Sequence, residues 1–338
     1  MATTLTKPLF LYPVSPAADS SQLNSVWHIR MSSRPALVYS RVVRSIAPAT
    51  KRYEHLFSNQ LLLNQVTNAL IGMKYTTCMY NQNPSITTPI ANMKSWSGNQ
   101  IAPTSNLQNR KIYLWTGSAD TTVGPNVMNA LKSQLSNFDT AADVSYVTTS
   151  GASHTFPTNF DGPGDNSCST SSSPYISNCN YDGAGAVLQW MYGTLNARNT
   201  GTLSGTIVSF DQTGAYGAAG MDSTGYLYVP ASCQSGTTVC KLHVALHGCL
   251  QSYSNIQMKF VQNTGYNQWA GQWKHPSRQG HPTNMLIPSD TNNIIILYPQ
   301  AIPDNTMHTI WGGTQLSNPN GCWDWVGWYG SNADQIGG

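Results

Sequence analysis

Short apolar runs separated by polar, glycine-rich segments mark most of the chain from residue 111 onward. Such runs predict buried strands, and they lie at 111–116, 144–149, 207–210, 226–229, 242–246 and 294–298. Between the first two, apolar side chains at helical spacing predict an amphipathic helix: Val127, Leu131, Leu135 and Phe138. Strands that alternate with helices indicate an α/β fold, and the third and fourth strands are close enough in sequence to pair antiparallel.

A second helix is expected after Asp182, whose side chain can cap it. Its apolar positions are Val187, Trp190, Met191 and Leu195. The strand within 241–250 (KLHVALHGCL) ends at His247-Gly248-Cys249. A glycine just past a strand permits a sharp turn, after which backbone amides can face a pocket, as in the oxyanion holes of serine esterases. The tripeptide fits equally an ordinary turn beside a packed histidine.

Composition narrows the class of protein. Only 9% of the 338 residues are charged, against about 25% in an average soluble domain. This polar but weakly charged composition suits a secreted, single-domain protein that meets a neutral, water-insoluble or sugar-like substrate. The net charge of +3 is too small to indicate nucleic-acid binding, and no run of 18 apolar residues predicts a membrane span.

Seven cysteines favour disulfides in an oxidising compartment, because two pairs are closely spaced in loops rich in Ser, Gly and Thr. The expected pairs are Cys168–Cys179, Cys233–Cys240 and Cys249–Cys322, with Cys78 left over. No spacing suggests a metal site, and no cofactor is expected. Residues 1–20 carry three prolines and no clean apolar core, so we expect no signal peptide there.

Asp120 and His154 each follow a predicted strand, at the sheet edge where α/β folds place their sites. An acid and a histidine on successive strand ends form two members of a Ser-His-Asp triad, in which the acid orients the imidazole. Taken singly, Asp120 also fits a turn residue and His154 a loop histidine. Both precede the turn at Cys249, whereas ordinary α/β-hydrolases have the oxyanion turn first. That reversed order predicts a circular permutation with the nucleophile near the N-terminus.

Several segments carry a family resemblance: TGSADTTVGPNVMN, SHTFPTNF, NCNYDGAG, ALHGCLQS and NPNGCWDWVGWYG. Together they resemble the fungal extracellular poly(3-hydroxybutyrate) depolymerases, over 75–270 and 290–338. The resemblance implies a circularly permuted α/β-hydrolase fold, with Asp120 as triad acid and His154 as triad base. It also implies an oxyanion amide at Cys249, a substrate contact at Trp325, and a monomer acting on a hydroxyalkanoate polyester. Trp323 or Trp328 is expected to pack in the core instead.

The family's nucleophile lies in an N-terminal Gly-Leu-Ser-Ser-Gly-Gly elbow, which this chain lacks. Ser118 stands inside the Asp120 turn and Ser97 in a polar stretch, so no nucleophile is identified. The basic segment 22–55 fits an arm that binds a polyanion, but we favour another interpretation. Reading permitted codons for 22–50 from their third base yields AQLGVAYSDVFKTGFGVFAGGPFDCARN, which resembles the family and returns a cysteine to pair with Cys78.

We therefore expect a frame-shifted or mis-spliced gene, with intron-like sequence at about 53–74 and at 271–289. Residues 1–74 would form an aberrant segment, disordered or poorly packed, that lacks the elbow strand and helix. Residues 75–338 would form the hydrolase domain, with an irregular insert at 271–289. The chain as written would be an inactive ester hydrolase. The alternatives are a non-catalytic polymer-binding protein and, less favoured because Cys322 would sequester its sulfur, catalysis by Cys249.

Overall fold

The structure, a computed structural model, describes these residues: 79–98, 101–140, 143–213, 219–234, 239–271, 292–310, 315–324 and 328–329, with two strands at 9–12 and 26–29. Cys78, Trp325 and almost all of the predicted insert lie outside the described residues, as does most of 1–74. The predictions made for them therefore stay predictions. Within the described part, no helix combines the length and apolar character needed to cross a bilayer.

The first sheet carries the Asp120 and His154 loops. Its strand order is β2 (Val26–Ile29), β1 (Leu9–Tyr12), β3 (Ile112–Gly117), β4 (Val144–Thr149), and β1, β3 and β4 run parallel. The predicted strands β3 and β4 are confirmed, and every residue of β3 is buried, as expected of a central parallel strand. β1 and β2, which pair antiparallel, both come from the segment predicted to be aberrant.

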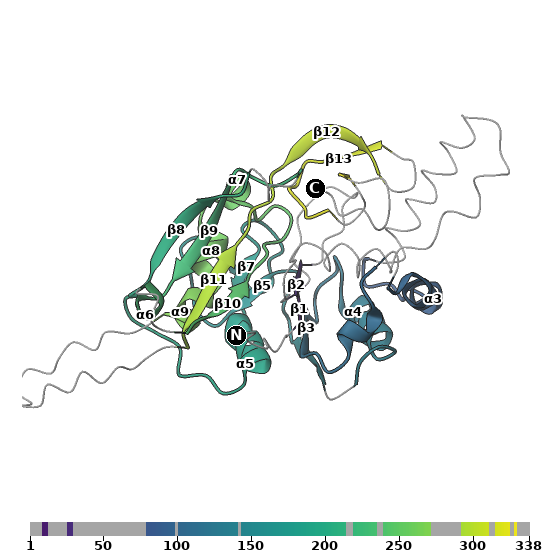
Figure 1. The fold of residues 1–338 in the computed structure, drawn as a ribbon, viewed down its shortest axis with the longest axis horizontal. Coiled ribbons are helices and arrows are strands. Elements are labelled where there is room, and N and C mark those ends of the chain that lie inside the picture. Colours follow the sequence, from purple (N-terminus) through teal and green to yellow (C-terminus); the bar gives the residue numbers. More distant parts are fainter. Residues whose placement is uncertain are drawn as a thin grey trace, which may run out of the picture.

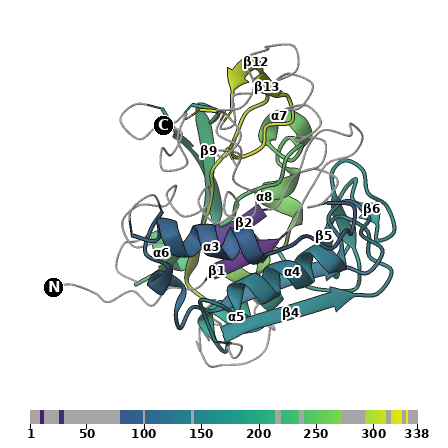
Figure 2. The ribbon, with the colours of Figure 1, turned by 90° about the vertical axis from the view of Figure 1, so that its right-hand side faces the viewer.

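Two helices cover one side of this sheet. α4 (Pro125–Leu135) begins at Pro125, a favourable first helical residue, and buries Leu131 and Leu135 against Ile112 and Leu114 of β3. Phe138, predicted on the same stripe, is buried just past the helix end. α3 (Thr87–Trp96) lies beside α4 (Figure 2) and adds Met93 to the same cluster.

The second sheet has the order β10 (Lys241–Val244), β11 (Ile294–Tyr298), β9 (Thr224–Val229), β8 (Thr206–Asp211). β10 and β11 are parallel, while β9 is antiparallel to both β11 and β8, which confirms the predicted pairing of β8 with β9. The six apolar runs therefore supply β3 and β4 of the first sheet and all four strands of the second (Figure 1), within a mixed α/β fold.

The main core lies on the inner face of the second sheet. It is covered by α5 (Gly183–Tyr192), α8 (Lys259–Asn263) and α9 (Tyr266–Ala270), with α7 (Tyr253–Ile256) beside them. The predicted cap is confirmed: Asp182 Oδ1 accepts the Gly185 N–H at 2.8 Å. A Cβ at Gly185 would overlap the Trp269 indole, so glycine permits the close approach of α5 to α9.

Smaller elements that the apolar pattern did not predict complete the fold. A three-stranded sheet pairs β5 (Phe156–Thr158) and β6 (Asn166–Ser167) with β7 (Ile176–Asn178). β12 (Asp304–Thr309) and β13 (Gln315–Asn318) form an antiparallel hairpin. A 3-10 helix (Thr104–Leu107) and α6 (Ala231–Gln234) complete the described elements.

Candidate active site

Asp120 and His154, which the sequence predicts as a pair, meet in the structure. Asp120 lies three residues beyond β3, and His154 lies five residues beyond β4. The His154 Nδ1 is 2.6 Å from the Asp120 Oδ2, and both side chains are fully or almost fully buried. A buried carboxylate at Nδ1 fixes the ring orientation and favours the tautomer with the proton on Nδ1.

The two loops meet because Gly117 ends β3. The Ala119 N–H donates to the Ala152 carbonyl at 2.9 Å, and a Cβ on Gly117 would overlap that same carbonyl oxygen. Ser118 adds a second link, since its Oγ accepts the Gly151 N–H at 2.8 Å. The approach of the loops therefore depends on a side-chain-free residue at the strand end. Gly117 is not among the predicted site residues, and its only sequence signal is its place in the TGSADTTVGPNVMN segment.

Asp120 is held as a carboxylate. Burial alone raises its pKa, but the charge of His154 and the hydrogen bond to it act in the opposite direction. Oδ1 also accepts the N–H groups of Thr122 and Val123 at 2.8 and 2.9 Å. Together these interactions lower the pKa below its ordinary value of 3.8.

The other ring nitrogen of His154 is available for proton transfer. Nε2 is buried and has no hydrogen-bond partner among the residues that the structure describes. A buried polar atom without a partner is costly in a folded protein. The arrangement therefore presents one oriented nitrogen lone pair, the feature that a general base needs.

The turn at Cys249 follows β10. Leu250, which comes next, adopts a left-handed backbone conformation with φ of 56°. His247 is fully buried: its Nε2 accepts the Ala301 N–H at 3.0 Å, while its Nδ1 lies 2.6 Å from the Gly248 carbonyl. Burial lowers the His247 pKa to about 4, so this ring stays neutral near pH 7. His247 thus supports the turn, the packed-histidine alternative that the sequence left open.

Gln251 joins this turn to the His154 loop. Its Oε1 accepts the Gly248 N–H at 2.9 Å, and its Nε2 donates to the carbonyls of Pro174 and Tyr175 at 3.0 and 3.1 Å. The Tyr175 carbonyl also accepts the N–H of Phe156, two residues past His154. One buried side chain thus ties the Cys249 turn to β5. Gln251 is not among the predicted site residues, and its only sequence signal is its place in the ALHGCLQS segment.

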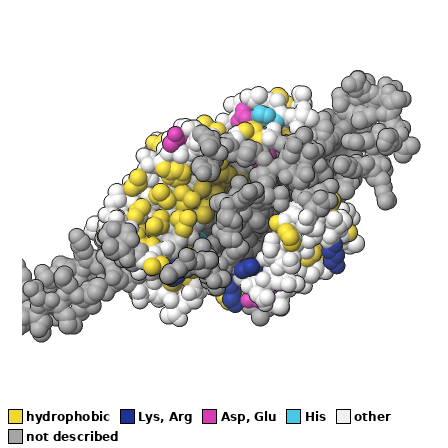
Figure 3. All heavy atoms as spheres, viewed as in Figure 1, with side chains coloured by type: hydrophobic (Ala, Val, Ile, Leu, Met, Phe, Trp, Pro, Cys, Tyr) yellow, Lys and Arg dark blue, Asp and Glu magenta, His cyan; other side chains and the backbone are white. Residues whose placement is uncertain are grey.

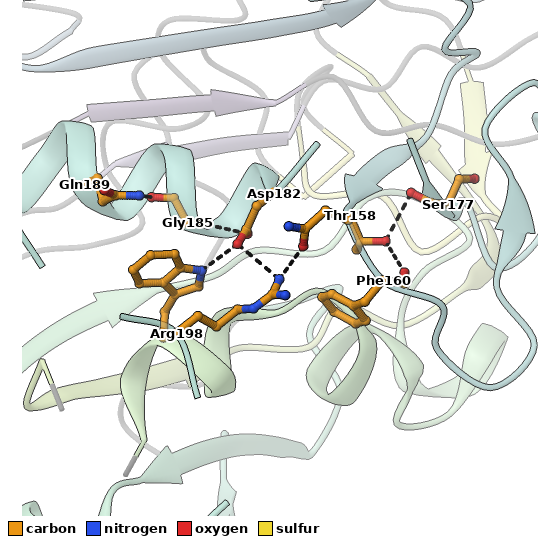
Figure 4. Close-up of polar contacts among 9 residues, drawn as sticks. Thr158, Phe160, Ser177, Asp182, Gly185, Gln189 and Arg198 are labelled. Carbon is orange, nitrogen blue, oxygen red and sulfur yellow. Dashed lines mark hydrogen bonds and ion pairs between the residues drawn. The ribbon is translucent and has the colours of Figure 1, made fainter. Parts of the chain in front are cut away.

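A polar network supports β5 from the other side (Figure 4). The Thr158 hydroxyl donates to the carbonyls of Phe160 and Ser177. Asp182, besides capping α5, accepts from Arg198 and from the Trp269 indole at 3.1 and 2.9 Å through Oδ2. Arg198 also donates to Asn159 and lies over the Phe160 ring. These contacts fix the chain on both sides of β5 and so limit the movement of the His154 loop.

Three disulfides lie in the described structure: Cys168–Cys179, Cys233–Cys240 and Cys249–Cys322. The third leaves Cys249 without a thiol, which argues against a cysteine nucleophile.

Cys322 precedes Trp323, whose indole donates to the His247 carbonyl at 2.9 Å, and Trp328 is buried. No group of three or more His, Cys, Asp or Glu that could hold a metal occurs in the described ranges.

Comparison with known proteins gives a family. No protein-family model matches the chain. The chain is 73% identical over 264 residues to a polyhydroxybutyrate depolymerase of Talaromyces funiculosus. The aligned region covers 78% of this chain and 72% of the relative. The chain is also 41% identical over 254 residues to a poly(3-hydroxybutyrate) depolymerase of Delftia acidovorans, covering 74% of this chain and 44% of that protein.

Two solved structures match with a TM-score of 0.70 and 73% identity, covering 78% of this chain and 77% of theirs. One is a PHB depolymerase from Penicillium funiculosum; the other is a serine-to-alanine variant of PHB depolymerase complexed with an R3HB trimer. Identity at this level over most of both chains, with the same fold, establishes kinship. The chain belongs to the polyhydroxybutyrate depolymerase family.

Proposed function

We propose that the gene encodes a secreted, monomeric serine esterase that cleaves 3-hydroxybutyrate polyester, and that the chain as written is its inactive form. The buried Asp120–His154 pair, with Nε2 unpartnered in the described structure, is the observation that carries this proposal. The R3HB trimer bound to a relative supports the substrate class. The three disulfides support an oxidising compartment.

The mechanism needs a serine placed at Nε2 of His154. Nε2 takes the hydroxyl proton as Oγ attacks the ester carbonyl carbon, and the oxyanion forms against backbone N–H groups, one of them from Cys249. Collapse of this intermediate breaks the ester bond, and Nε2 returns the proton to the leaving alkoxide. Water then repeats the sequence on the acyl-enzyme and releases the acid. Asp120 stabilises the imidazolium at both stages.

A shift of reading frame would account for the missing serine, because permitted codons allow the elbow motif in the shifted frame. The third-base frame that gives a family-like segment from residue 22 extends upstream. With permitted codons for 13–19, PVSPAAD, written CCG GTC TCT CCA GCG GCG GAC, this frame spells GGT CTC TCC AGC GGC GGA. That is Gly-Leu-Ser-Ser-Gly-Gly, the elbow motif itself. One continuous shifted frame thus supplies both the elbow and the segment after it.

The shifted reading frame would also give the chain the order of a circularly permuted hydrolase. The elbow would precede Asp120, His154 and the Cys249 turn along the chain, whereas an unpermuted hydrolase begins with the oxyanion turn. Residues 75–338 would then supply the remainder of a single hydrolase domain, and 1–74 would be its misread start, with 271–289 an insert. Trp325 would line the ester-binding crevice.

Transcript sequencing and one pair of proteins test the proposal. The transcript is expected to carry the shifted frame over 13–50 and to lack the sequence for 271–289. The chain as written should not hydrolyse p-nitrophenyl butyrate, whereas the chain with the frame restored should. In the restored chain, Asp120→Asn should lower kcat by about four orders of magnitude. A transcript that encodes 13–50 as written would overturn the frame shift.

A second candidate is a polymer-binding protein without activity, favoured by the lack of an identified nucleophile. It predicts adsorption to polyhydroxybutyrate film by the chain as written, with no turnover by either form. Hydrolysis by the chain as written, abolished by Asp120→Asn, would contradict both candidates, because it requires a nucleophile within the present sequence.

A further inference from the structure

Charged side chains are sparse on this protein, since only 9% of its residues are Asp, Glu, Lys or Arg. The face drawn in Figure 3 shows only a few small groups of them among the described residues. Neutral hydrogen-bonding groups therefore have a large part in holding the loops of the candidate site, as Gln251 does at the Cys249 turn. Asn81, which is not among the predicted site residues, is a second group of this kind, and it binds the loop of Asp120.

Asn81 caps helix α4 from a distant part of the chain. Gly124, at the N-cap position of α4, has no side chain that could accept an N–H group of the first turn. The Asn81 Oδ1 takes this role and accepts the Asn126 N–H at 2.8 Å, while the Asn126 side chain donates to the Asn81 carbonyl at 2.9 Å. A Cβ on Gly124 would overlap the Asn81 side chain, so this glycine leaves room for the cap.

The backbone next to this cap binds the Asp120 loop. The Tyr80 N–H donates to the Thr122 carbonyl at 2.9 Å, and the Asn81 N–H donates to the following carbonyl, that of Val123, also at 2.9 Å. The N–H groups of Thr122 and Val123 are the two that the Asp120 Oδ1 accepts. The peptide group between Thr122 and Val123 thus accepts a hydrogen bond at its oxygen and donates one at its nitrogen, which polarises it and strengthens both bonds.

Asn81 meets two demands at once. Its backbone is left-handed, with φ of 55°, a conformation that asparagine adopts more readily than most residues with a side chain. Its side chain also has to supply an oxygen to the first turn of α4. Aspartate meets both demands as well, whereas glycine meets only the first, so the two substitutions separate the cap from the backbone conformation.

We propose that Asn81 is a positioning residue for the Asp120–His154 pair: it fixes the Asp120 loop and so keeps the carboxylate on the His154 Nδ1. This inference rests on the proposed function, in which Asp120 orients the general base. Asn81 acts through the peptide groups of Thr122 and Val123 rather than on a substrate. Without its side chain the loop opens more often, and the bond between Asp120 and His154 breaks with it.

The test follows the Nδ1 proton of His154 by NMR in the full chain as written, with isotope-labelled histidine. An imidazole N–H bonded to a buried carboxylate gives a signal far downfield, and His154→Gln identifies that signal by removing it. In Asn81→Gly this proton should exchange with water at least about 10-fold faster than in the parent, because local opening exposes it. The amide protons of Thr122 and Val123 should exchange faster too. Asn81→Asp should restore the parent rates, since it keeps the acceptor at the helix N-terminus.

Two control variants separate positioning from general stability. Asn109→Gly makes the same change at an exposed asparagine that is also left-handed, with φ of 56°. Ile294→Val removes a methyl group from a fully buried side chain of the second sheet and should lower the Tm. In both controls the His154 proton should exchange at the parent rate well below the Tm. If Asn81→Gly loses the near-UV dichroism of the parent, Asn126→Ala takes its place, because it removes only the side-chain donor to the Asn81 carbonyl.

The possible outcomes are distinct. Parent-like exchange in Asn81→Gly, equal acceleration in Ile294→Val, or no rescue by Asn81→Asp would each overturn the positioning role. A parent chain without the downfield signal would lack the bond between Asp120 and His154, and it would overturn this inference together with the proposed function. The readout needs no hydrolysis, so a restored chain that fails to cleave ester leaves this inference standing and counts only against the proposed catalysis.

Discussion

The His154 Nδ1 lies 2.6 Å from the Asp120 Oδ2, and Asp120 accepts two further N–H groups through its other oxygen. The carboxylate is thus bonded on both sides and cannot turn away from the imidazole without losing a buried hydrogen bond. A pair fixed in this way contributes to stability, and that contribution can be measured in the chain as written.

Asp120→Asn should lower the free energy of unfolding at pH 6 by about 2 kcal/mol, since it removes a charged, buried hydrogen-bond acceptor. The folded-state pKa of Asp120 is lowered, so its stabilisation is present above its ordinary pKa of 3.8 and is lost as the pH falls further. Urea titrations at pH 6 and pH 3 check both statements. The parent should lose more stability than the variant on acidification; equal losses would contradict the assignment.

His247 should make stability depend on pH in a separate window. Its folded-state pKa is about 4 against an ordinary 6.5, so the unfolded chain binds a proton in this range that the folded chain excludes. Stability should therefore rise between about pH 4 and 6.5, by at most about 3 kcal/mol. The non-titrating His247→Gln variant should show a flatter profile in urea unfolding. A profile as steep as the parent's would assign the slope to other groups.

Gly117→Ala should destabilise the chain by about 1–3 kcal/mol, because the added methyl group overlaps the Ala152 carbonyl and separates the two site loops. Gly151→Ala is the matched control: its φ is 70°, but a Cβ there meets no atom within 4 Å. That change should cost about 1 kcal/mol through backbone strain alone. Thermal unfolding of the two variants separates overlap from strain, and an equal shift in Tm would refute the close-approach explanation.

Gln251→Ala should cost about 2–4 kcal/mol, since it leaves a buried N–H and shared carbonyl groups without their partner. Gln251→Glu keeps the acceptor for Gly248 but removes the donor to Pro174 and Tyr175, so it should not rescue stability. Hydrogen exchange should show faster exchange at the Gly248 amide in the alanine variant. Unchanged protection there would mean that the side chain does not hold the turn.

The larger part of the fold follows from apolar pattern. β3 and β11 are nearly continuous apolar runs, and α4 carries its apolar stripe at helical spacing, so the apolar pattern specifies them. β6, β12 and β13 have the sequences NS, DNTMHT and QLSN, which show no such period. β12 pairs with β13 and β6 pairs with β7, so each strand is set by contact with its partner, which the propensity of a single segment does not record.

Some residues of the candidate site can likewise be predicted from the sequence, and others cannot. The positions of Asp120 and His154 follow from their places after successive strands, a local feature that sequence reveals. Gln251 does not, because its role depends on carbonyl groups about 76 residues away that only the fold brings near. His247, noted as part of a turn, has a supporting function set by its burial.

β10 is the outermost strand of its sheet in the described structure, with β11 on one side only. A short strand left at the border offers its main chain to a second molecule, and intermolecular pairing of that kind seeds aggregates. The yield of soluble protein on expression should therefore depend on the residues of this edge strand, in which Lys241 is the only charged residue.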